Sequence, residues 1–177
     1  EFRRVLFRSA LSFPEKRSFI KQALASAVRN NFRQAESIAG VATAGIPQGA
    51  LVADELALPF LYVRPKPKDH GMQNLIEGKV VPGQRVVLVE DLISTGGSSL
   101  KAAEALRDAG FQVEGMVAIF TYGFETAAQA FQQAGIPLVC LSNFSYLLEE
   151  ALRMGFITSE QTGFVSKWRE DPANWGV

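Results

Sequence analysis

The sequence predicts a single α/β domain with a central, mostly parallel sheet flanked by helices on both faces. Short apolar runs typical of strands alternate with segments whose apolar residues recur at helical spacing. The run RVVLVE at 85–90 is almost continuously apolar, as expected of a strand buried on both faces. The 177 residues, 47% of them hydrophobic, can close one core and are too few for two ordinary domains.

The first half of the chain contains two helix–strand repeats. Pro14 stands near the start of a predicted helix, LSFPEKRSFIKQALASAVRNNF. A strand is predicted in ESIAGVATAG, a helix with Pro47 in its first turn in PQGALVADELAL, and a second strand in PFLYVR. The stretch 65–84 is polar and rich in proline and glycine, so it predicts one extended loop of a length that is usually functional or disordered.

The second half continues the alternation. After the strand at 85–90, GSSLKAAEALRDAG predicts a helix with Ser98 or Ser99 as its cap and Gly110 as its stop. Further strands are predicted in FQVEGMVAIFTY and IPLVCL, and further helices in ETAAQAFQQAG and SYLLEEALRMG. Ligands of such sheets bind beyond the carboxyl ends of the strands, which places Glu90 and Asp91 at a ligand site.

The first ten residues of the chain differ in character from the rest. EFRRVLFRSA is basic, lacks a helix cap and joins abruptly to the first predicted helix. We interpret residues 1–9 as a non-native cloning scar, with a native frayed terminus as the alternative, and residues 10–177 as the single domain.

Composition excludes several classes of partner. Lys plus Arg and Asp plus Glu balance at 18 each, which argues against a nucleic-acid binder or a membrane-surface protein. Cys140 is the single cysteine, so no intrachain disulfide forms; its apolar surroundings indicate a packed strand residue rather than a nucleophile. No apolar stretch is long enough to span a bilayer, and a cytoplasmic location is expected.

The stretch VVLVEDLISTGGSS contains a candidate phosphate site. Residues 94–99 form a predicted strand-to-helix turn whose backbone N–H groups converge on an anion at the positive end of the helix dipole. Gly96 and Gly97 allow a ligand to approach the backbone closely. The turn matches neither a Walker A loop nor a dinucleotide fingerprint.

The adjacent carboxylates of Glu90 and Asp91 narrow the choice of ligand. They repel a phosphate unless the ligand also presents hydroxyls or a metal ion. A ribose phosphate with Mg²⁺ meets this requirement, because the acids accept hydrogen bonds from the sugar hydroxyls while the turn holds the phosphate. The alternative is that both acids only help to cap the turn.

This stretch resembles the diphosphoribosyl-binding motif of type I phosphoribosyltransferases. Together with GVATAGIPQGALVADELALPFLYVRPKPKDHG and IFTYGF, it is similar to the orotate phosphoribosyltransferase family. The resemblance implies the type I phosphoribosyltransferase fold. It also implies transfer of ribose 5-phosphate from phosphoribosyl pyrophosphate to orotate, giving orotidine 5-phosphate and pyrophosphate in de novo UMP synthesis.

The resemblance also implies roles for particular residues. Arg64, Lys68 and His70 would bind the pyrophosphate moiety, and the loop of Lys68 and His70 would close over the site of a neighbouring subunit in a homodimer. Glu90 and Asp91 would bind the ribose hydroxyls, and Lys68, His70 and Asp91 would take part in catalysis. Mg²⁺ would be bound mainly through phosphoribosyl pyrophosphate, without metal ligands from the chain. The segment assigned to ribose phosphate binding comprises Glu90, Asp91, Leu92, Ile93, Ser94, Thr95, Gly96, Gly97 and Ser98, with Ser94 also at orotate.

The sequence departs from the family pattern in three places. Ala44 stands where some members carry a lysine, and Lys66 is displaced by one position from another family lysine. The family normally has a further helix and an aromatic segment before LSFPEKRSFIKQ, so an incomplete base pocket is expected. The alternatives are a purine or uracil phosphoribosyltransferase, and a regulator that senses phosphoribosyl pyrophosphate and binds nucleic acid; the balanced charge argues against the regulator.

Overall fold

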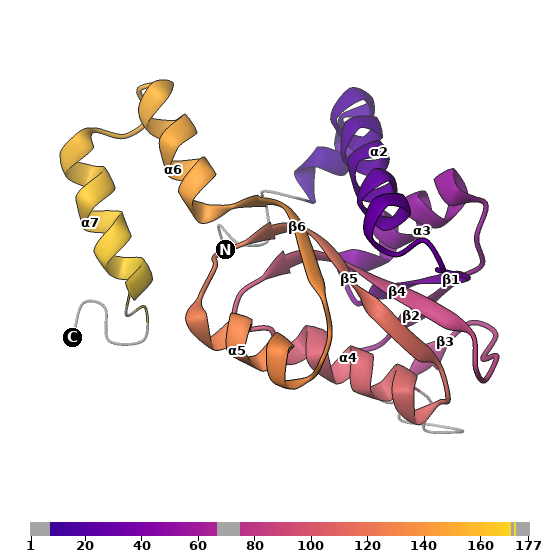
Figure 1. Ribbon diagram of the computed structural model, residues 1–177. Helices are drawn as coiled ribbons and strands as arrows, with labels where there is room; N and C mark the ends of the chain where they lie inside the picture. Colours follow the sequence, from indigo (N-terminus) through magenta and orange to yellow (C-terminus); the bar gives the residue numbers. More distant parts are fainter. Residues whose placement is uncertain (1–7, 67–74, 171, 173–177) are drawn as a thin grey trace.

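The computed structural model describes residues 8–66, 75–170 and 172. Within these residues the chain forms a six-stranded sheet in the order β3-β2-β1-β4-β5-β6 (Figure 1). Neighbouring strands are parallel except for the antiparallel pair β2 and β3, which confirms the predicted mostly parallel sheet. The strands are β1 (Ser37–Val41), β2 (Phe60–Val63), β3 (Ile76–Glu77), β4 (Arg85–Ile93), β5 (Gln112–Thr121) and β6 (Leu138–Asn143).

Helices cover both faces of this sheet (Figure 1). One face carries α2 (Pro14–Asn31) and α3 (Gly45–Leu56), and the other carries α4 (Gly97–Asp108) and α5 (Glu125–Gln133). A short 3-10 helix, η1 (Ser9–Ser12), precedes α2. Beyond β6, α6 (Phe144–Arg153) and α7 (Ser159–Glu170) form a hairpin to one side of the sheet.

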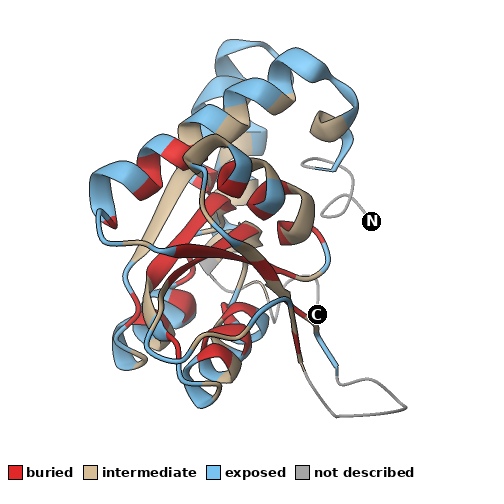
Figure 2. Cartoon of the chain, turned by 90° about the vertical axis from the view of Figure 1, so that its right-hand side faces the viewer, coloured by how far each residue is buried: buried red, intermediate tan, exposed pale blue. Residues whose placement is uncertain are grey.

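Strand β4 separates two apolar cores. Val86 and Leu88 belong to the core beneath α4 and α5, whereas Val87 and Val89 belong to the core beneath α2 and α3. All four side chains are fully buried, and Figure 2 shows the buried residues concentrated on the central strands. This alternation explains the nearly continuous apolar run and confirms the predicted doubly covered strand.

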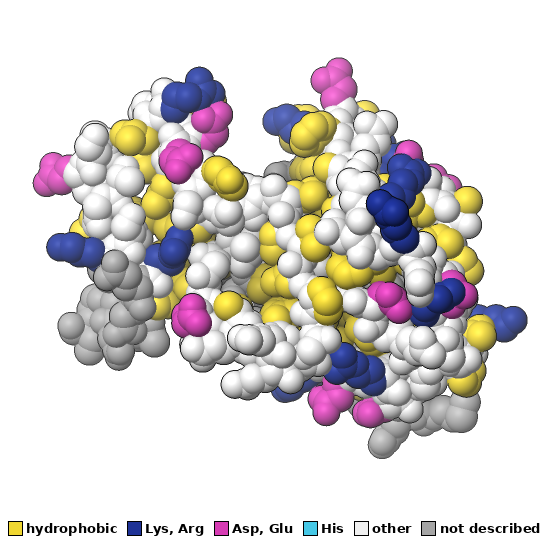
Figure 3. All heavy atoms as spheres, in the orientation of Figure 1, with side chains coloured by type: hydrophobic (Ala, Val, Ile, Leu, Met, Phe, Trp, Pro, Cys, Tyr) yellow, Lys and Arg dark blue, Asp and Glu magenta, His cyan; other side chains and the backbone are white. Residues whose placement is uncertain are grey.

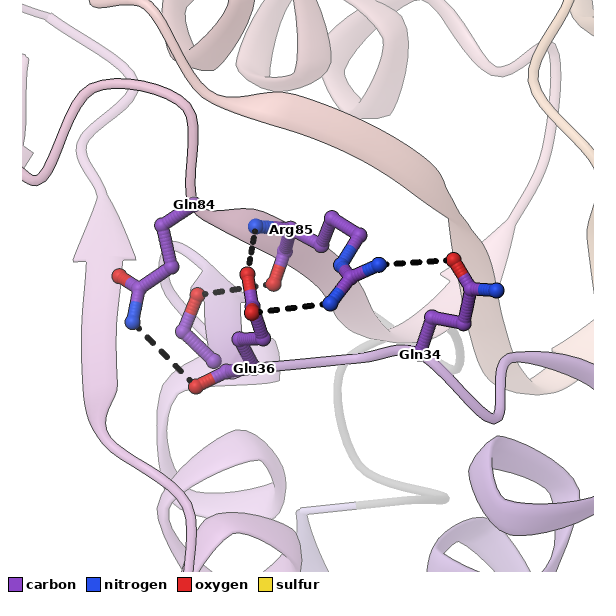
Figure 4. Close-up of polar contacts among 5 residues, drawn as sticks. Gln34, Glu36, Gln84 and Arg85 are labelled. Carbon is purple, nitrogen blue, oxygen red and sulfur yellow. Dashed lines mark hydrogen bonds and ion pairs between the residues drawn. The ribbon is translucent and has the colours of Figure 1, made fainter.

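The starts of β1 and β4 are joined by polar contacts (Figure 4). The Arg85 backbone N–H donates to Glu36 Oε2 at 2.9 Å, and the Arg85 guanidinium donates to Glu36 Oε1 at 2.9 Å. A second guanidinium nitrogen donates to Gln34 Oε1 at 2.8 Å, and the Ser37 hydroxyl donates to the Arg85 carbonyl at 3.3 Å. These bonds hold Ser37 opposite Val86, so the carboxyl ends of the two strands lie at one edge.

Two sequence predictions about β-structure were wrong in detail. The stretch 65–84 is not one continuous loop, because β3 pairs with β2 through Tyr62 and Val63. A two-residue strand has no periodicity to detect. The predicted strand at 85–90 also ended too early, because β4 continues past Glu90 to Ile93 and therefore includes Asp91.

The predicted cap of α4 was also wrong. The N-cap is Gly96, whose φ of 82° lies in the left-handed region, and no side chain caps this helix. Ser99 instead donates its hydroxyl to Glu90. The predicted stop at Gly110 is confirmed: its φ is 91°, and the N–H groups of Gly110 and Phe111 donate back to the carbonyls of Arg107 and Leu106.

Helix α7 was not predicted from the sequence. Thr158 and Gln161 form a reciprocal capping box at its start, and the sequence TSEQ at 158–161 is a pattern that indicates a helix N-terminus. The helix is anchored by Trp168, whose ring lies 5.7 Å from Tyr122, 6.0 Å from Phe124 and 5.6 Å from Phe144, centroid to centroid.

The α6–α7 hairpin leaves large hydrophobic side chains exposed. Tyr146 and Leu147 of α6, Phe164 of α7, and Phe156 between the helices are among them. Hydrophobic side chains are visible at the surface near this hairpin in Figure 3. The anchoring aromatic cluster lies at the carboxyl ends of β5 and β6, so the hairpin is attached beside the edge of the sheet that holds the candidate site.

Candidate active site at the carboxyl edge of the sheet

Parallel pairing brings the segments after β1, β2 and β4 to one edge of the sheet. A groove of about 910 Å³ opens there, lined by Ala42 after β1, by Arg64 after β2, and by Gly97 and Ser98 at the start of α4. These residues are distant in sequence, and the groove unites the predicted phosphate turn with the predicted pyrophosphate-binding arginine.

The turn at 94–96 leads directly into α4. Because no side chain caps the helix, its first N–H groups remain available to an anion. A Cβ at Gly96 would lie 2.9 Å from the Phe131 ring, so the turn packs against α5 at this position. A Cβ at Gly97 would meet nothing within 4 Å, and both Gly97 and Ser98 are exposed. The backbone of this turn is therefore fixed on one side and open on the other.

Glu90 is held by its own chain. Its side chain is 6% exposed; Oε1 accepts the Asp91 backbone N–H at 2.9 Å, and Oε2 accepts the Ser99 hydroxyl at 3.2 Å. Burial, reinforced by the neighbouring Asp91 carboxyl, raises the pKa of Glu90 to about 9. Burial therefore favours the uncharged form of Glu90, whereas the sequence predicted an ionised acceptor.

The next three residues of β4 have different surroundings. Asp91 and Leu92 are half-buried, so Asp91 is the more accessible of the two acids. The Ile93 side chain is fully buried in the core beneath α4, and its carbonyl accepts the Tyr122 N–H at 3.1 Å. Contact between Ile93 and a ligand is therefore limited to its backbone.

Arg64 is positioned by the edge hairpin. Its backbone N–H donates to the Leu75 carbonyl at 2.8 Å, and its guanidinium lies 3.6 Å from a Glu77 carboxylate oxygen. These contacts tie Arg64 to β3 while it lines the groove. The predicted site residues Lys68 and His70 lie outside the described residues.

Lys101 also lines the groove and was not among the predicted residues. It is exposed on α4, and the helical period places it on the same face as Gly97 and Ser98. That spacing was readable from the sequence. Cys140 is half-buried on β6, and burial raises its thiol pKa to about 12, so it is not an activated nucleophile.

The described part of the chain contains neither a metal-binding cluster nor a membrane-spanning helix. No group of three or more His, Cys, Asp or Glu side chains gathers there in a way that would hold a metal ion. None of the described helices has the length and apolar character needed to cross a membrane.

Comparison with known proteins identifies the family. Residues 16–122 match the phosphoribosyl transferase domain. An orotate phosphoribosyltransferase of Cytophaga hutchinsonii is 55% identical over 168 residues, which cover 95% of this chain and 80% of that protein. One from Bacteroides fragilis is 58% identical over 95% of this chain and 79% of its own length. The chain belongs to the orotate phosphoribosyltransferase family.

Solved structures agree with this membership. Orotate phosphoribosyltransferase from Aeropyrum pernix has a TM-score of 0.75 and 31% identity, covering 85% of this chain and 82% of that one. Leishmania donovani UMP synthase has a TM-score of 0.79 and 26% identity, covering 92% of this chain and 35% of that one. The predicted type I phosphoribosyltransferase fold and the predicted enzyme class are confirmed.

Replacing Glu90 with Gln is expected to change how stability depends on pH. The folded-state pKa of Glu90 is raised from 4.5 to about 9, so this group stabilises the fold fully below the lower value. That stabilisation is lost as the pH rises through the higher value. The wild-type free energy of unfolding should therefore fall with pH relative to that of Glu90→Gln, which urea denaturation at about pH 5, 7 and 8.5 measures.

The exposed Glu104 on α4 provides the matched control. Glu104→Gln makes the same chemical change at a surface position and leaves the buried Glu90 carboxyl in place. Because Glu104→Gln retains Glu90, its free energy of unfolding should fall with pH as that of the wild type does. Parallel curves for wild type and Glu90→Gln would contradict the raised pKa.

Proposed function

We propose that this chain transfers ribose 5-phosphate from phosphoribosyl pyrophosphate to N1 of orotate, releasing orotidine 5-phosphate and pyrophosphate for pyrimidine synthesis. One observation carries the proposal: the uncapped start of α4 and Arg64 line one groove, and Asp91 stands at the end of the strand that leads into that helix. Free N–H groups at a helix start suit a phosphate, an arginine suits a diphosphate, and a carboxylate suits sugar hydroxyls. The names of the relatives support the choice of orotate.

The 5-phosphate is assigned to the backbone and hydroxyl groups of residues 94–98, with Ser94 also facing orotate. Asp91 is assigned to the ribose hydroxyls, because it is the more accessible acid. Bond breaking to pyrophosphate leaves positive charge on the sugar and adds negative charge to the leaving group. The Asp91 carboxylate stabilises the first, and Arg64, with Lys68 and His70, stabilises the second.

Mg²⁺ fits this assignment as an ion carried by the substrate. Diphosphate and sugar oxygens are the hard ligands that Mg²⁺ prefers, and it commonly binds with few protein ligands. The described residues offer no metal-binding cluster of their own. The bound ion would neutralise charge on the departing pyrophosphate, while the chain orients the sugar and the base.

We further propose a cytoplasmic homodimer in which the loop of Lys68 and His70 serves the site of the neighbouring subunit. Arg64 supports this assignment, because it follows β2, lines the groove and precedes Lys68 by four residues in the sequence. A loop that closes over bound substrate excludes water from the reacting centre.

Asp91→Asn is expected to preserve the fold and lower kcat/KM about thirtyfold, equivalent to about 2 kcal/mol of lost transition-state stabilisation. The amide keeps the shape of the side chain but loses the charge-assisted acceptor. Steady-state kinetics with orotate, phosphoribosyl pyrophosphate and Mg²⁺ measures the change. Asp54→Asn, at an exposed position on α3, is the control and should retain wild-type kinetics; equal kinetics for both variants would refute the assignment.

Subunit mixing tests the shared loop. Lys68→Ala and Asp91→Asn proteins are each expected to be strongly impaired, and a mixed dimer contains one site with neither substitution if Lys68 acts across the interface. Mixing should then restore up to about a quarter of wild-type activity, as random pairing predicts. No recovery after verified subunit exchange would show that Lys68 acts within its own subunit.

A further inference from the structure

A buried hydrogen bond closes the phosphate turn at its base. Ser99, the third residue of α4, is 2% exposed and donates its hydroxyl to Glu90 Oε2 at 3.2 Å across nine residues of sequence. The other carboxyl oxygen accepts the Asp91 N–H at 2.9 Å. One side chain therefore joins the end of β4 to the first turn of α4.

The segment enclosed by this bond contains the proposed binding turn, residues 94–98. Other contacts hold the turn from outside: the Ile93 carbonyl accepts the Tyr122 N–H, and Gly96 packs against Phe131. Those contacts attach the turn to β5 and α5. The bond between Glu90 and Ser99 instead sets the separation of the two arms of the turn.

We propose that Ser99 is a positioning residue of the phosphoribosyl site, which acts through Glu90 to hold the N–H groups of the turn in their binding arrangement. The proposal rests on the proposed placement of the ribose phosphate at residues 94–98. Without the Ser99 hydroxyl, a carboxyl oxygen of buried Glu90 lacks its partner. Glu90 then reorients toward another donor, and the strand end to which it is bonded moves with it. An anion site made of backbone N–H groups depends on their direction, so small displacements weaken binding.

Ser99→Ala should raise the KM for phosphoribosyl pyrophosphate about tenfold and change kcat by less than about twofold, as expected for loss of one buried hydrogen bond. Ser37→Ala is the matched control, because Ser37 is also fully buried and donates one hydroxyl bond, to Arg85 at the opposite edge of the sheet. Both variants should lose similar thermal stability. Only Ser99→Ala should lose substrate affinity; an unchanged KM, or an equal change in Ser37→Ala, overturns the proposal.

Action through Glu90 is tested in a Glu90→Ala background. There Ser99 has no carboxyl to hold, so adding Ser99→Ala should leave the KM for phosphoribosyl pyrophosphate unchanged. If Ser99→Ala raises the KM by the same factor in the Glu90→Ala background as in the wild type, Ser99 does not act through Glu90. Asp91→Asn separates this role from the proposed function: if it impairs turnover while Ser99→Ala behaves as wild type, the role of Ser99 fails and the proposed function stands. If neither variant affects the reaction, the placement of the site fails as well.

Discussion

Parallel pairing of β4 with β1 on one side and β5 on the other determines where the functional residues lie. The pairing runs from Arg85, opposite Gln112, to Ile93, opposite Thr121, and Ser37 is held opposite Val86 on the other side. Parallel strands whose first residues are paired also end near one another, so the segments that follow them lie at the carboxyl edge of the sheet. The groove with Ala42, Arg64 and Gly97 is the result. The polar contacts of Arg85 lie at the other edge, and they support the site by setting this register.

The site combines a rigid frame with unsatisfied binding groups. Val87 and Val89 pack on one side of β4 and Val86 and Leu88 on the other, so the strand cannot slide without exposing apolar surface. At its end the chain makes a glycine turn into a helix without a side-chain cap. The free N–H groups at the start of this helix, at the positive end of its dipole, can bind an anion. Burial raises the pKa of Glu90 to about 9, which favours its uncharged form beside the proposed phosphate turn.

Features set by local sequence were predictable, and features set by distant contacts were not. The apolar run of β4, Pro14 in the first turn of α2 and the stop at Gly110 follow from local preferences, and the structure agrees. The burial of Glu90 and its bond to Ser99, nine residues away, arise only in the folded chain, so adjacency to Asp91 alone suggested two ionised acids.

The same distinction applies to the rest of the fold and site. The pairing of β3 depends on Tyr62 and Val63, which precede it by more than ten residues. Helix α7 is an exception, because its capping box is local in sequence and the helix was still not predicted. The proposed phosphate turn was predicted from its own residues, whereas Arg64 was assigned through family resemblance. The spacing that places Lys101 on the groove face of α4 was present in the sequence but was not used. The roles of Lys68 and His70 stay predictions.

The central claim is that the turn between β4 and α4 binds the phosphate of the sugar through its backbone. Two-dimensional ¹H–¹⁵N amide spectra of the protein, titrated with ribose 5-phosphate, test it most directly. We predict that the largest saturable shifts belong to the amides of residues 94–98, with smaller shifts at Asp91. Unmoved amides in this turn, together with shifts at the groove between α6 and α7 that contains Thr162 and Ser166, would contradict it.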